Sequence, residues 1–182
     1  MKQELDEIRQ IVTFQLENTF FGIDVFKIDK IMKKENLIDL PDQKTHYLVA
    51  MIRIQEEIIS VVSLRKRFSM LEKKLPKEKI IVIRYNDNLI GLLIDDVRKL
   101  VEFENEQIIK VKHSFGLPQN FFEGKIVIDG KEIFILDIYN LLAFEGELKF
   151  QKDSAVKEEV SREVSKIKKK KSPSSTKGKE KS

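Results

Sequence analysis

Two stretches of the chain decide the fold: IVTFQLENTFFGIDVFKIDKI, residues 11–31, and IIVIRYNDNLIGLLIDDVRKL, residues 80–100. They align without a gap at a shift of 69 positions, and Gly22 of the first stretch falls on Gly91 of the second. Each copy opens with a β-rich apolar run, passes through Asn and acidic residues typical of a tight turn, and ends in a second apolar run. Each stretch therefore predicts a β-hairpin, and the shared glycine indicates a bulge or a close backbone approach.

A further pair of segments, residues 47–64 and 121–138, matches at a shift of 74 positions, so the repeat covers nearly the whole apolar part of the chain. In the later copy, Asp129-Gly130 supplies a positive-φ turn for another hairpin, and Asp137 is expected to cap a short helix. The earlier copy predicts a helix with three apolar residues on one face: Leu64, Phe68 and Leu71.

Short strands at regular intervals favour closed β-barrels over an open sheet with exposed edges. Because the two halves are similar, we predict an all-β fold of two small barrels side by side with short helical connections. We expect the first barrel over residues 15–78 and the second over residues 79–146, with the N-terminal strand 8–14 added to the second. A single barrel of eight to ten strands is the alternative.

Composition excludes several classes of protein. The 182 residues include no cysteine and two histidines, which argues against a disulfide scaffold and a zinc cluster. No apolar run approaches the roughly 18 residues of a membrane span, and the start MKQELDEIRQ has no apolar signal core. We therefore expect a cytoplasmic, soluble protein without direct membrane insertion.

The positive charge of the chain is concentrated at its C-terminal end. Residues 149–182 hold 12 basic and 5 acidic side chains, a net +7, whereas the preceding residues carry a net −3. We expect a basic tail over residues 147–182, with a short helix over residues 154–167 followed by a disordered segment. The helix is either a solvated one or one that docks on a partner.

Four motifs occur in an order that resembles the CheW-like domain of bacterial chemotaxis, over roughly residues 8–146. They are Phe20-Phe21-Gly22-Ile23-Asp24-Val25, Ile28-Asp29-Lys30-Ile31, VVSLRKRF at 61–68 and LLIDDVRKLV at 92–101. The resemblance implies two five-stranded SH3-like barrels. It also implies a non-enzymatic adaptor that couples the cytoplasmic tips of chemoreceptors to the regulatory domain of the histidine kinase CheA. Such an adaptor lies at the inner face of the membrane, in receptor arrays.

The chain departs from the family pattern in one loop, which reads AMIRIQEEIISVVSLR from residue 50 to residue 65. Gln55 stands in place of the usual Arg, Glu56 in place of a Gly and Ser63 in place of an Asp. Lys30 stands where the family has an acidic residue. We predict that Lys30 pairs with Glu56 or Glu57, which would restore an ion pair of reversed polarity and tune partner choice.

The resemblance implies a protein-binding groove between the barrels. Its candidate residues are Ile28, Lys30, Met32, Ile54, Gln55, Glu56, Arg65 and Val97. Arg65 is either a structural anchor beside the groove or a cation at a helix start that faces solvent. Ile28 and Val97 either line the groove or belong to a barrel core.

Catalysis and cofactor binding have no support in the sequence. It lacks a Gly-rich phosphate loop and an H-E-x-x-H motif, and adjacent strand residues such as Asp95 and Asp96 point to opposite faces. We expect no catalytic, cofactor or metal site. The alternative function is a small β-barrel that binds nucleic acid with its basic tail, but the net −3 of the preceding residues argues against nucleic acid as a partner.

Overall fold

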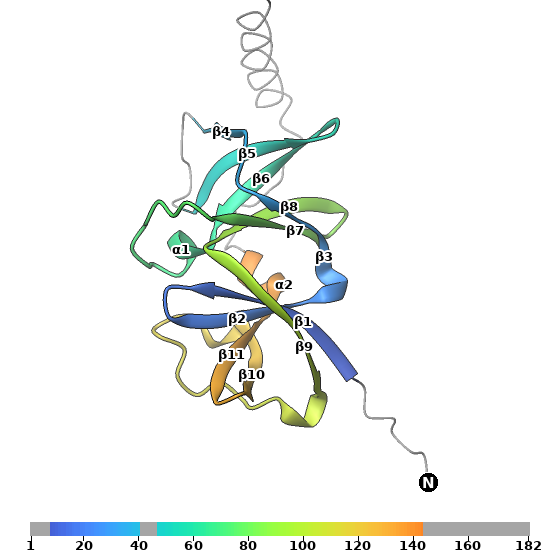
Figure 1. The fold of residues 1–182 in the computed structure, drawn as a ribbon, viewed down its shortest axis with the longest axis vertical. Coiled ribbons are helices and arrows are strands. Elements are labelled where there is room, and N and C mark those ends of the chain that lie inside the picture. The colour runs from blue at the N-terminus through green and yellow to red at the C-terminus, as the bar shows by residue number, and fades with distance from the viewer. Residues whose placement is uncertain (1–7, 41–46, 144–182) are drawn as a thin grey trace, which may run out of the picture. The chain divides into compact units, whose positions relative to one another are not determined.

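The computed structural model describes residues 8–40 and 47–143, and its main elements are eleven strands in two sheets (Figure 1). The prediction of a mainly β fold with short helical connections is confirmed. The basic tail, with its expected helix over residues 154–167, lies outside the described residues.

The first sheet has five strands in the order β10-β11-β2-β1-β9. Their bounds are β1 Ile8–Leu16, β2 Thr19–Asp24, β9 Asp96–Glu104, β10 Phe122–Ile128 and β11 Lys131–Leu136. The second sheet has six strands in the order β3-β7-β8-β6-β5-β4. Their bounds are β3 Ile28–Lys33, β4 Leu37–Asp39, β5 Leu48–Ile54, β6 Glu57–Ser63, β7 Lys79–Tyr85 and β8 Asn88–Ile94.

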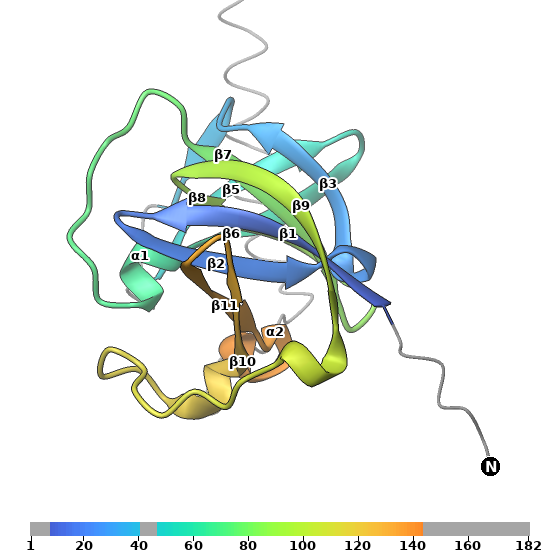
Figure 2. The same ribbon diagram turned by 60° about the horizontal axis from the view of Figure 1, so that its bottom comes forward.

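The two halves of the repeat exchange their first hairpins. The hairpin β1–β2 lies in the five-stranded sheet with the late strands β9, β10 and β11, and the hairpin β7–β8 lies in the six-stranded sheet with β3 to β6. Figure 1 shows the blue hairpin against the orange strands, and Figure 2 shows the same arrangement from another side. The sheets therefore do not follow the expected division at residue 79, because each takes strands from both halves.

The strand registers repeat as closely as the sequence does. Strand β11 pairs in parallel with β2, with Ile135 opposite Gly22, and β6 pairs in parallel with β8, with Val61 opposite Gly91. The two pairings are equivalent, because Ile135 matches Val61 at the shift of 74 positions and Gly22 matches Gly91 at the shift of 69. The left-handed turn residues coincide too, since Glu17 matches Asn86 and Gln55 matches Asp129.

Gly22 and Gly91 mark a close approach between neighbouring strands. A Cβ atom on Gly22 would lie 2.5 Å from Cδ1 of Ile11, and one on Gly91 would lie 2.9 Å from Cγ2 of Ile80. Each pair is antiparallel within its hairpin, so the isoleucine packs where the glycine leaves room. The expected close approach is confirmed.

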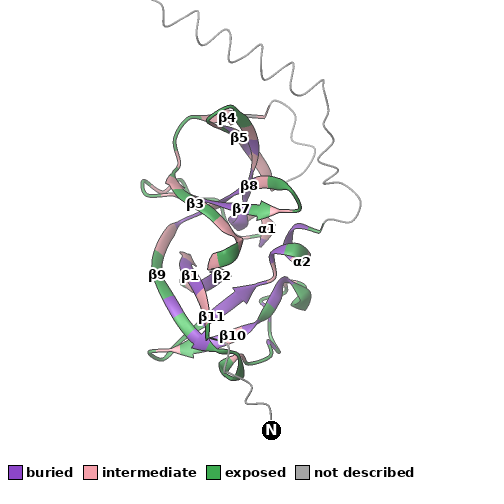
Figure 3. Cartoon of the chain, turned by 90° about the vertical axis from the view of Figure 1, so that its right-hand side faces the viewer, coloured by how far each residue is buried: buried purple, intermediate pink, exposed green. Residues whose placement is uncertain are grey.

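Each sheet has its own hydrophobic core. The five-stranded sheet packs around a cluster with the members Ile11, Val101, Phe103, Ile126, Ile133 and Ile135. The six-stranded sheet packs around a cluster with the members Ala50, Ile52, Ile59, Val61, Ile80 and Val82. The ring centre of Phe21, on β2, lies 5.2 Å from the ring centre of Phe68, which comes a few residues after β6. This aromatic contact joins the two sheets. Figure 3 shows the buried residues running along strands of both sheets.

Two short helices, α1 Leu64–Arg67 and α2 Ile138–Leu142, follow β6 and β11. The side chain of Asp137 accepts a hydrogen bond from the backbone N–H of Asn140 at 3.0 Å, which confirms the predicted cap. Ser63 caps α1 in the same way by accepting from the N–H of Lys66, so this hydroxyl caps the helix at the position of the family's Asp. The expected face with Leu71 is wrong, because α1 ends at Arg67 and Leu71 is 78% exposed.

Candidate protein-binding site

Strand β3 carries three of the candidate residues. Ile28, Lys30 and Met32 are all half-buried, and the residues between them are exposed. A bulge follows Ile28 and shifts the register against β7, so only Lys30 and Met32 share one face by the alternation of a strand. Met32 packs against the core cluster of the six-stranded sheet. Its side chain therefore has a structural role as well as a partly accessible surface.

The turn between β5 and β6 holds the next three candidates. Ile54 is half-buried and packs against the same core as Met32, whereas Gln55 and Glu56 are exposed at the tip. Gln55 adopts a φ of 54°, the left-handed conformation that a two-residue hairpin turn needs. The turn thus presents a neutral amide and a carboxylate to solvent.

The predicted ion pair between Lys30 and this turn is wrong. The ammonium of Lys30 lies 3.5 Å from Oδ2 of its neighbour Asp29, and no salt bridge joins Lys30 to Glu56 or Glu57. Asp29 also accepts a hydrogen bond from Arg84 of β7 at 2.7 Å. A carboxylate on the same strand therefore supplies the counter-charge that we expected from the turn.

Ile28 and Val97 occupy equivalent positions on different sheets. Ile28 lies opposite Ile83 in the six-stranded sheet, and Val97 lies opposite Phe14 in the five-stranded sheet. Each stands just after the point where the chain crosses from one sheet to the other, and each is half-buried. Both are therefore partly accessible rather than fully enclosed in a core.

Arg65 is a buried anchor and does not face solvent. It is 5% exposed, and its Nε and Nη2 donate to the two carboxylate oxygens of Asp95 at 2.6 and 2.5 Å. Its Nη1 donates to Oε1 of Glu17 at 3.1 Å and to the carbonyl oxygen of Leu71 at 2.8 Å. The hydrogen bond with Asp95 raises the pKa of Arg65 against the opposing effect of burial, so the guanidinium stays charged.

The Arg65 cluster lies where the chain passes from the six-stranded sheet to the five-stranded sheet, between β8 and β9. Asp95 is the single residue between β8 and β9, and its Oδ2 also accepts from the backbone N–H of Glu17 at 3.0 Å. Glu17 lies in the β1–β2 turn of the five-stranded sheet, while Arg65 follows β6 of the six-stranded sheet. One guanidinium therefore fixes elements of both sheets.

A second arginine, Arg67, joins the two helices. Its Nε donates to the carbonyl oxygen of Leu141 in α2 at 3.1 Å, and its guanidinium carbon lies 4.3 Å from the ring centre of Phe121. Burial lowers the pKa of Arg67. These contacts bring a carbonyl dipole and an aromatic face to the guanidinium.

The structure thus distributes the eight candidates over three places. Met32 and Ile54 share one core, with Gln55 and Glu56 beside them at the turn. Ile28 and Val97 mark the two sheet crossings, and Lys30 lies next to the first of them. Arg65 holds the second crossing through Asp95.

Phe26, the most exposed aromatic residue in the described part of the chain, was not among the predicted site residues. It is 90% exposed and lies in the 3-10 turn Val25–Lys27 between β2 and β3. Asp24 fixes this turn, because its carboxylate accepts from the backbone N–H of Phe26 at 3.0 Å and from Arg9 at 3.0 Å. Lys27 binds Glu123 at 3.0 Å and lies 5.8 Å from the ring centre of Tyr139.

The internal repeat indicates that this surface differs from the corresponding place in the other half of the chain. At the shifts of 69 and 74 positions, Phe26 matches Asp95 and Tyr139 matches Arg65. One crossing therefore carries a buried ion pair, and the other carries two exposed aromatic residues, since Tyr139 is 52% exposed. We call Phe26 and Tyr139 the crossing aromatics.

Comparison with known proteins decides the family. The model of the CheW-like domain family matches residues 10–145. The chain belongs to this family. A CheW-like protein of this kind is a chemotaxis scaffold, and proteins of the family are adaptors rather than enzymes.

Individual relatives agree with the CheW-like assignment. The chain is 24% identical over 144 residues to the chemotaxis protein CheW of Treponema pallidum, an alignment that covers 76% of this chain and 84% of that one. It is 25% identical over 146 residues to CheW of Thermotoga maritima, with 78% and 94% covered. The crystal structure of the scaffolding protein TtCheW from Thermoanaerobacter tengcongensis has the same fold, with a TM-score of 0.71, 23% identity, and coverage of 81% and 96%.

Within residues 8–40 and 47–143, no group of three or more His, Asp or Glu side chains is placed to hold a metal ion. In the same part of the chain, the helices are all too short or too polar to span a bilayer.

Proposed function

We propose that this chain couples the cytoplasmic tips of chemoreceptors to the regulatory domain of the histidine kinase CheA in receptor arrays, at the inner face of the membrane. The observation that carries the proposal is the match of the CheW-like family over residues 10–145, which spans both sheets. In this proposal the two sheets are the SH3-like barrels of the family. The six-stranded sheet, which holds β3 to β6, corresponds to the first barrel and docks on the kinase, while the groove between the two sheets holds the receptor.

The surface of the first sheet crossing supports an adaptor role. An adaptor has to keep apolar side chains at its surface in the free state, because these form the centre of a protein interface. Phe26 is such a side chain, and the ion pairs of Asp24 and Lys27 hold its turn in one place. A large aromatic residue on a pre-organised turn has the properties of an interface hot spot.

The eight candidate groove residues enter the proposal in two roles. Ile28, Lys30, Met32, Ile54, Gln55, Glu56 and Val97 are accessible or half-buried and supply partner contacts. Arg65 is 5% exposed and acts as a positioning residue, because it fixes the second crossing from within.

A pull-down with purified CheA regulatory domain and receptor-tip fragments tests the proposal. Full-length protein and a 1–148 version should both bind, because the match to the family lies within residues 10–145. Phe26→Ser should weaken one of the two interactions at least tenfold, which corresponds to about 1.4 kcal/mol and is within the range of a hot-spot residue.

Leu100→Ser is the matched control. Leu100 is 52% exposed on β9 and lies away from the first crossing in sequence and in sheet order. This variant should bind as the parent does. If neither partner binds the full-length chain, the assignment is one of fold and family without this coupling role.

A further inference from the structure

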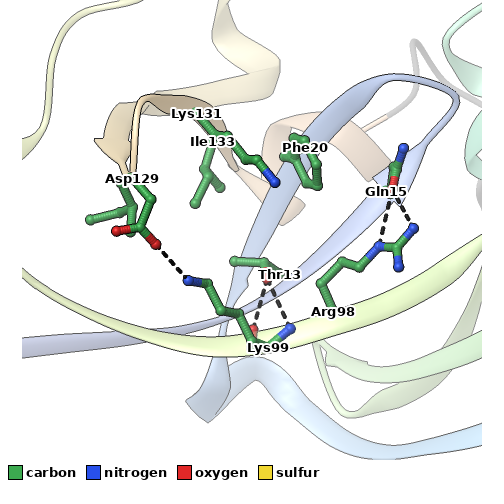
Figure 4. A pocket seen from close by; sticks show the side chains of 9 residues that line it. Thr13, Gln15, Phe20, Arg98, Lys99, Asp129, Lys131 and Ile133 are labelled. Carbon is green, nitrogen blue, oxygen red and sulfur yellow. Dashed lines mark hydrogen bonds and ion pairs between the residues drawn. The ribbon is translucent and has the colours of Figure 1, made fainter.

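A hollow of about 530 Å³ opens in the five-stranded sheet, between the β10–β11 turn and strands β1 and β9 (Figure 4). We call it the basic hollow. Its volume lies within the range of roughly 300–1,000 Å³ that small-molecule sites occupy. Its lining combines an apolar floor with charged side chains at the rim.

The floor consists of apolar side chains of the sheet core, of which Phe20 and Ile128 remain partly accessible, whereas Ile133 is buried. Phe20 of β2 lies opposite Ile133 of β11 in the parallel pairing, and both line the hollow. Phe20 and Ile128 are only partly buried, although both pack against the core cluster of the sheet. A flat apolar group entering the hollow would therefore bury surface that is accessible to water in the free protein.

Three cations and one carboxylate surround this floor. The ammonium of Lys131 lies 5.0 Å from the ring centre of Phe20, and it has no salt bridge to a carboxylate in residues 8–40 or 47–143. Lys99 reaches Oδ2 of Asp129 at 3.1 Å, in a pair whose side chains are 58% and 76% exposed. Arg98 donates from Nε to Oε1 of Gln15 at 3.0 Å, and its Nη1 lies 3.7 Å from Oδ2 of Asp96, which does not line the hollow.

The repeat provides an internal comparison for these charges. At the corresponding positions of the six-stranded sheet, Asp29 matches Arg98, Lys30 matches Lys99, and Glu57 matches Lys131. The six-stranded sheet thus has two acidic residues and one cation at the positions where the five-stranded sheet has three cations. The fold itself does not require cations at these positions.

We propose that the basic hollow binds a small organic anion with a flat apolar body, such as an aromatic carboxylate. The body lies against Phe20 and Ile128, and the anionic group lies between the ammonium groups of Lys99 and Lys131. Lys99 exchanges Asp129 for the ligand at little cost, because exposed ion pairs contribute little to stability. Thr13 fixes the backbone of Lys99 on the floor side, since its hydroxyl accepts from the N–H and donates to the carbonyl oxygen of that residue.

The proposal is separate from receptor and kinase coupling, so it is tested without either partner. We suggest titrating the isotope-labelled full-length chain with 2-naphthoate and following its amide resonances by NMR. We expect a dissociation constant of about 1 mM, typical of a ligand with so few atoms. The shifts should be concentrated at Thr13, Lys99 and Lys131.

The contribution of charge to binding is tested by changing the ligand and by changing the protein. 2-Naphthamide has the same rings without the charge, and it should bind about tenfold more weakly or not at all, as expected for the loss of a charge-assisted hydrogen bond. The double variant Lys99→Gln with Lys131→Gln should weaken 2-naphthoate binding to a similar extent. Both side chains line an open hollow, so the variant should fold, which its dispersed spectrum verifies.

The matched control is Lys110→Gln with Lys112→Gln, which removes two exposed lysines outside the hollow. It should bind 2-naphthoate as the parent does. Equal binding of the acid and the amide, shifts centred elsewhere, or unchanged binding by the Lys99/Lys131 variant would each overturn the proposal.

Discussion

The substitution Arg65→Met tests whether one guanidinium holds the two sheets together. It removes four hydrogen bonds and leaves the carboxylate of Asp95, which is 9% exposed, with only the N–H of Glu17 as a partner. Removing one member of a buried ion pair costs about 3–5 kcal/mol, because the remaining charge is uncompensated. We expect a loss of about 3 kcal/mol in the free energy of unfolding, since Glu17 and Asp95 retain some contact with water.

The assay is urea unfolding followed by circular dichroism, with a thermal scan in parallel. For a domain of this size the loss corresponds to a Tm lower by about 10 °C. The pKa of Arg65 is raised, so its stabilising effect is present below its ordinary value and lost only at far higher pH. The loss should therefore be the same at neutral pH and at a pH of about 9.

Two further variants make the test specific. Arg84→Met breaks the pair of Arg84 with Asp29, in which the arginine side chain is 66% exposed, and it should cost less than about 1 kcal/mol. Arg65→Met combined with Asp95→Leu removes both buried charges and should regain at least about 1 kcal/mol over the single variant. A loss below about 1 kcal/mol for Arg65→Met, or a double variant no better than the single one, would refute the reasoning.

Three other substitutions follow from the packing and are measured by the same unfolding assay. Gly124→Ala should lower stability by more than about 2 kcal/mol, because its Cβ would lie 2.3 Å from Ile108 and 3.0 Å from the backbone oxygen of Ile109, and a loss under about 0.5 kcal/mol would contradict the geometry. Gly22→Ala should cost less, about 1–2 kcal/mol, because the end of the Ile11 side chain can shift, so a greater loss than at Gly124 would be unexpected. Asp137→Ala should cost about 1 kcal/mol through the lost helix cap, and Asp137→Asn, which keeps the acceptor, should restore most of it.

The local structure of the chain was largely predictable from its sequence. The hairpins, the left-handed turn at Asp129, the cap at Asp137 and the close approach at the paired glycines all depend on a few neighbouring residues. The length of α1 was not predictable in the same way. The apolar spacing of Leu64, Phe68 and Leu71 suits a helix, but Leu71 leaves the core, and its carbonyl oxygen binds Arg65 instead.

The exchange of hairpins between the sheets could not be read from the repeat. A repeat shows which segments are alike, but it does not show which sheet each segment joins. The deciding contacts are the parallel pairings of β2 with β11 and of β6 with β8, which join segments distant in sequence. No local pattern in either strand specifies such a partner.

The candidate site was predicted in part for the same reason. The position of Arg65 in a family motif marked it as important, but its partners Asp95 and Glu17 come from distant turns. Lys30 was expected to find its counter-charge across the sheet and instead has Asp29 beside it. Phe26 was not predicted as a surface residue, because a phenylalanine in an apolar run gives no indication that its turn projects outward.

The exchanged hairpins also determine how the chain can be divided. A cut in the exposed segment between α1 and β7 would leave an N-terminal piece that lacks β7 and β8, two central strands of the six-stranded sheet. The same piece would contain β1 and β2, which belong to the five-stranded sheet. Neither piece could satisfy its backbone hydrogen bonds alone, yet each carries what the other is missing. The two pieces are therefore expected to fold only when they are mixed and form a complex. By the same exchange of hairpins, two copies of a half-length chain could form two sheets of this kind as a dimer.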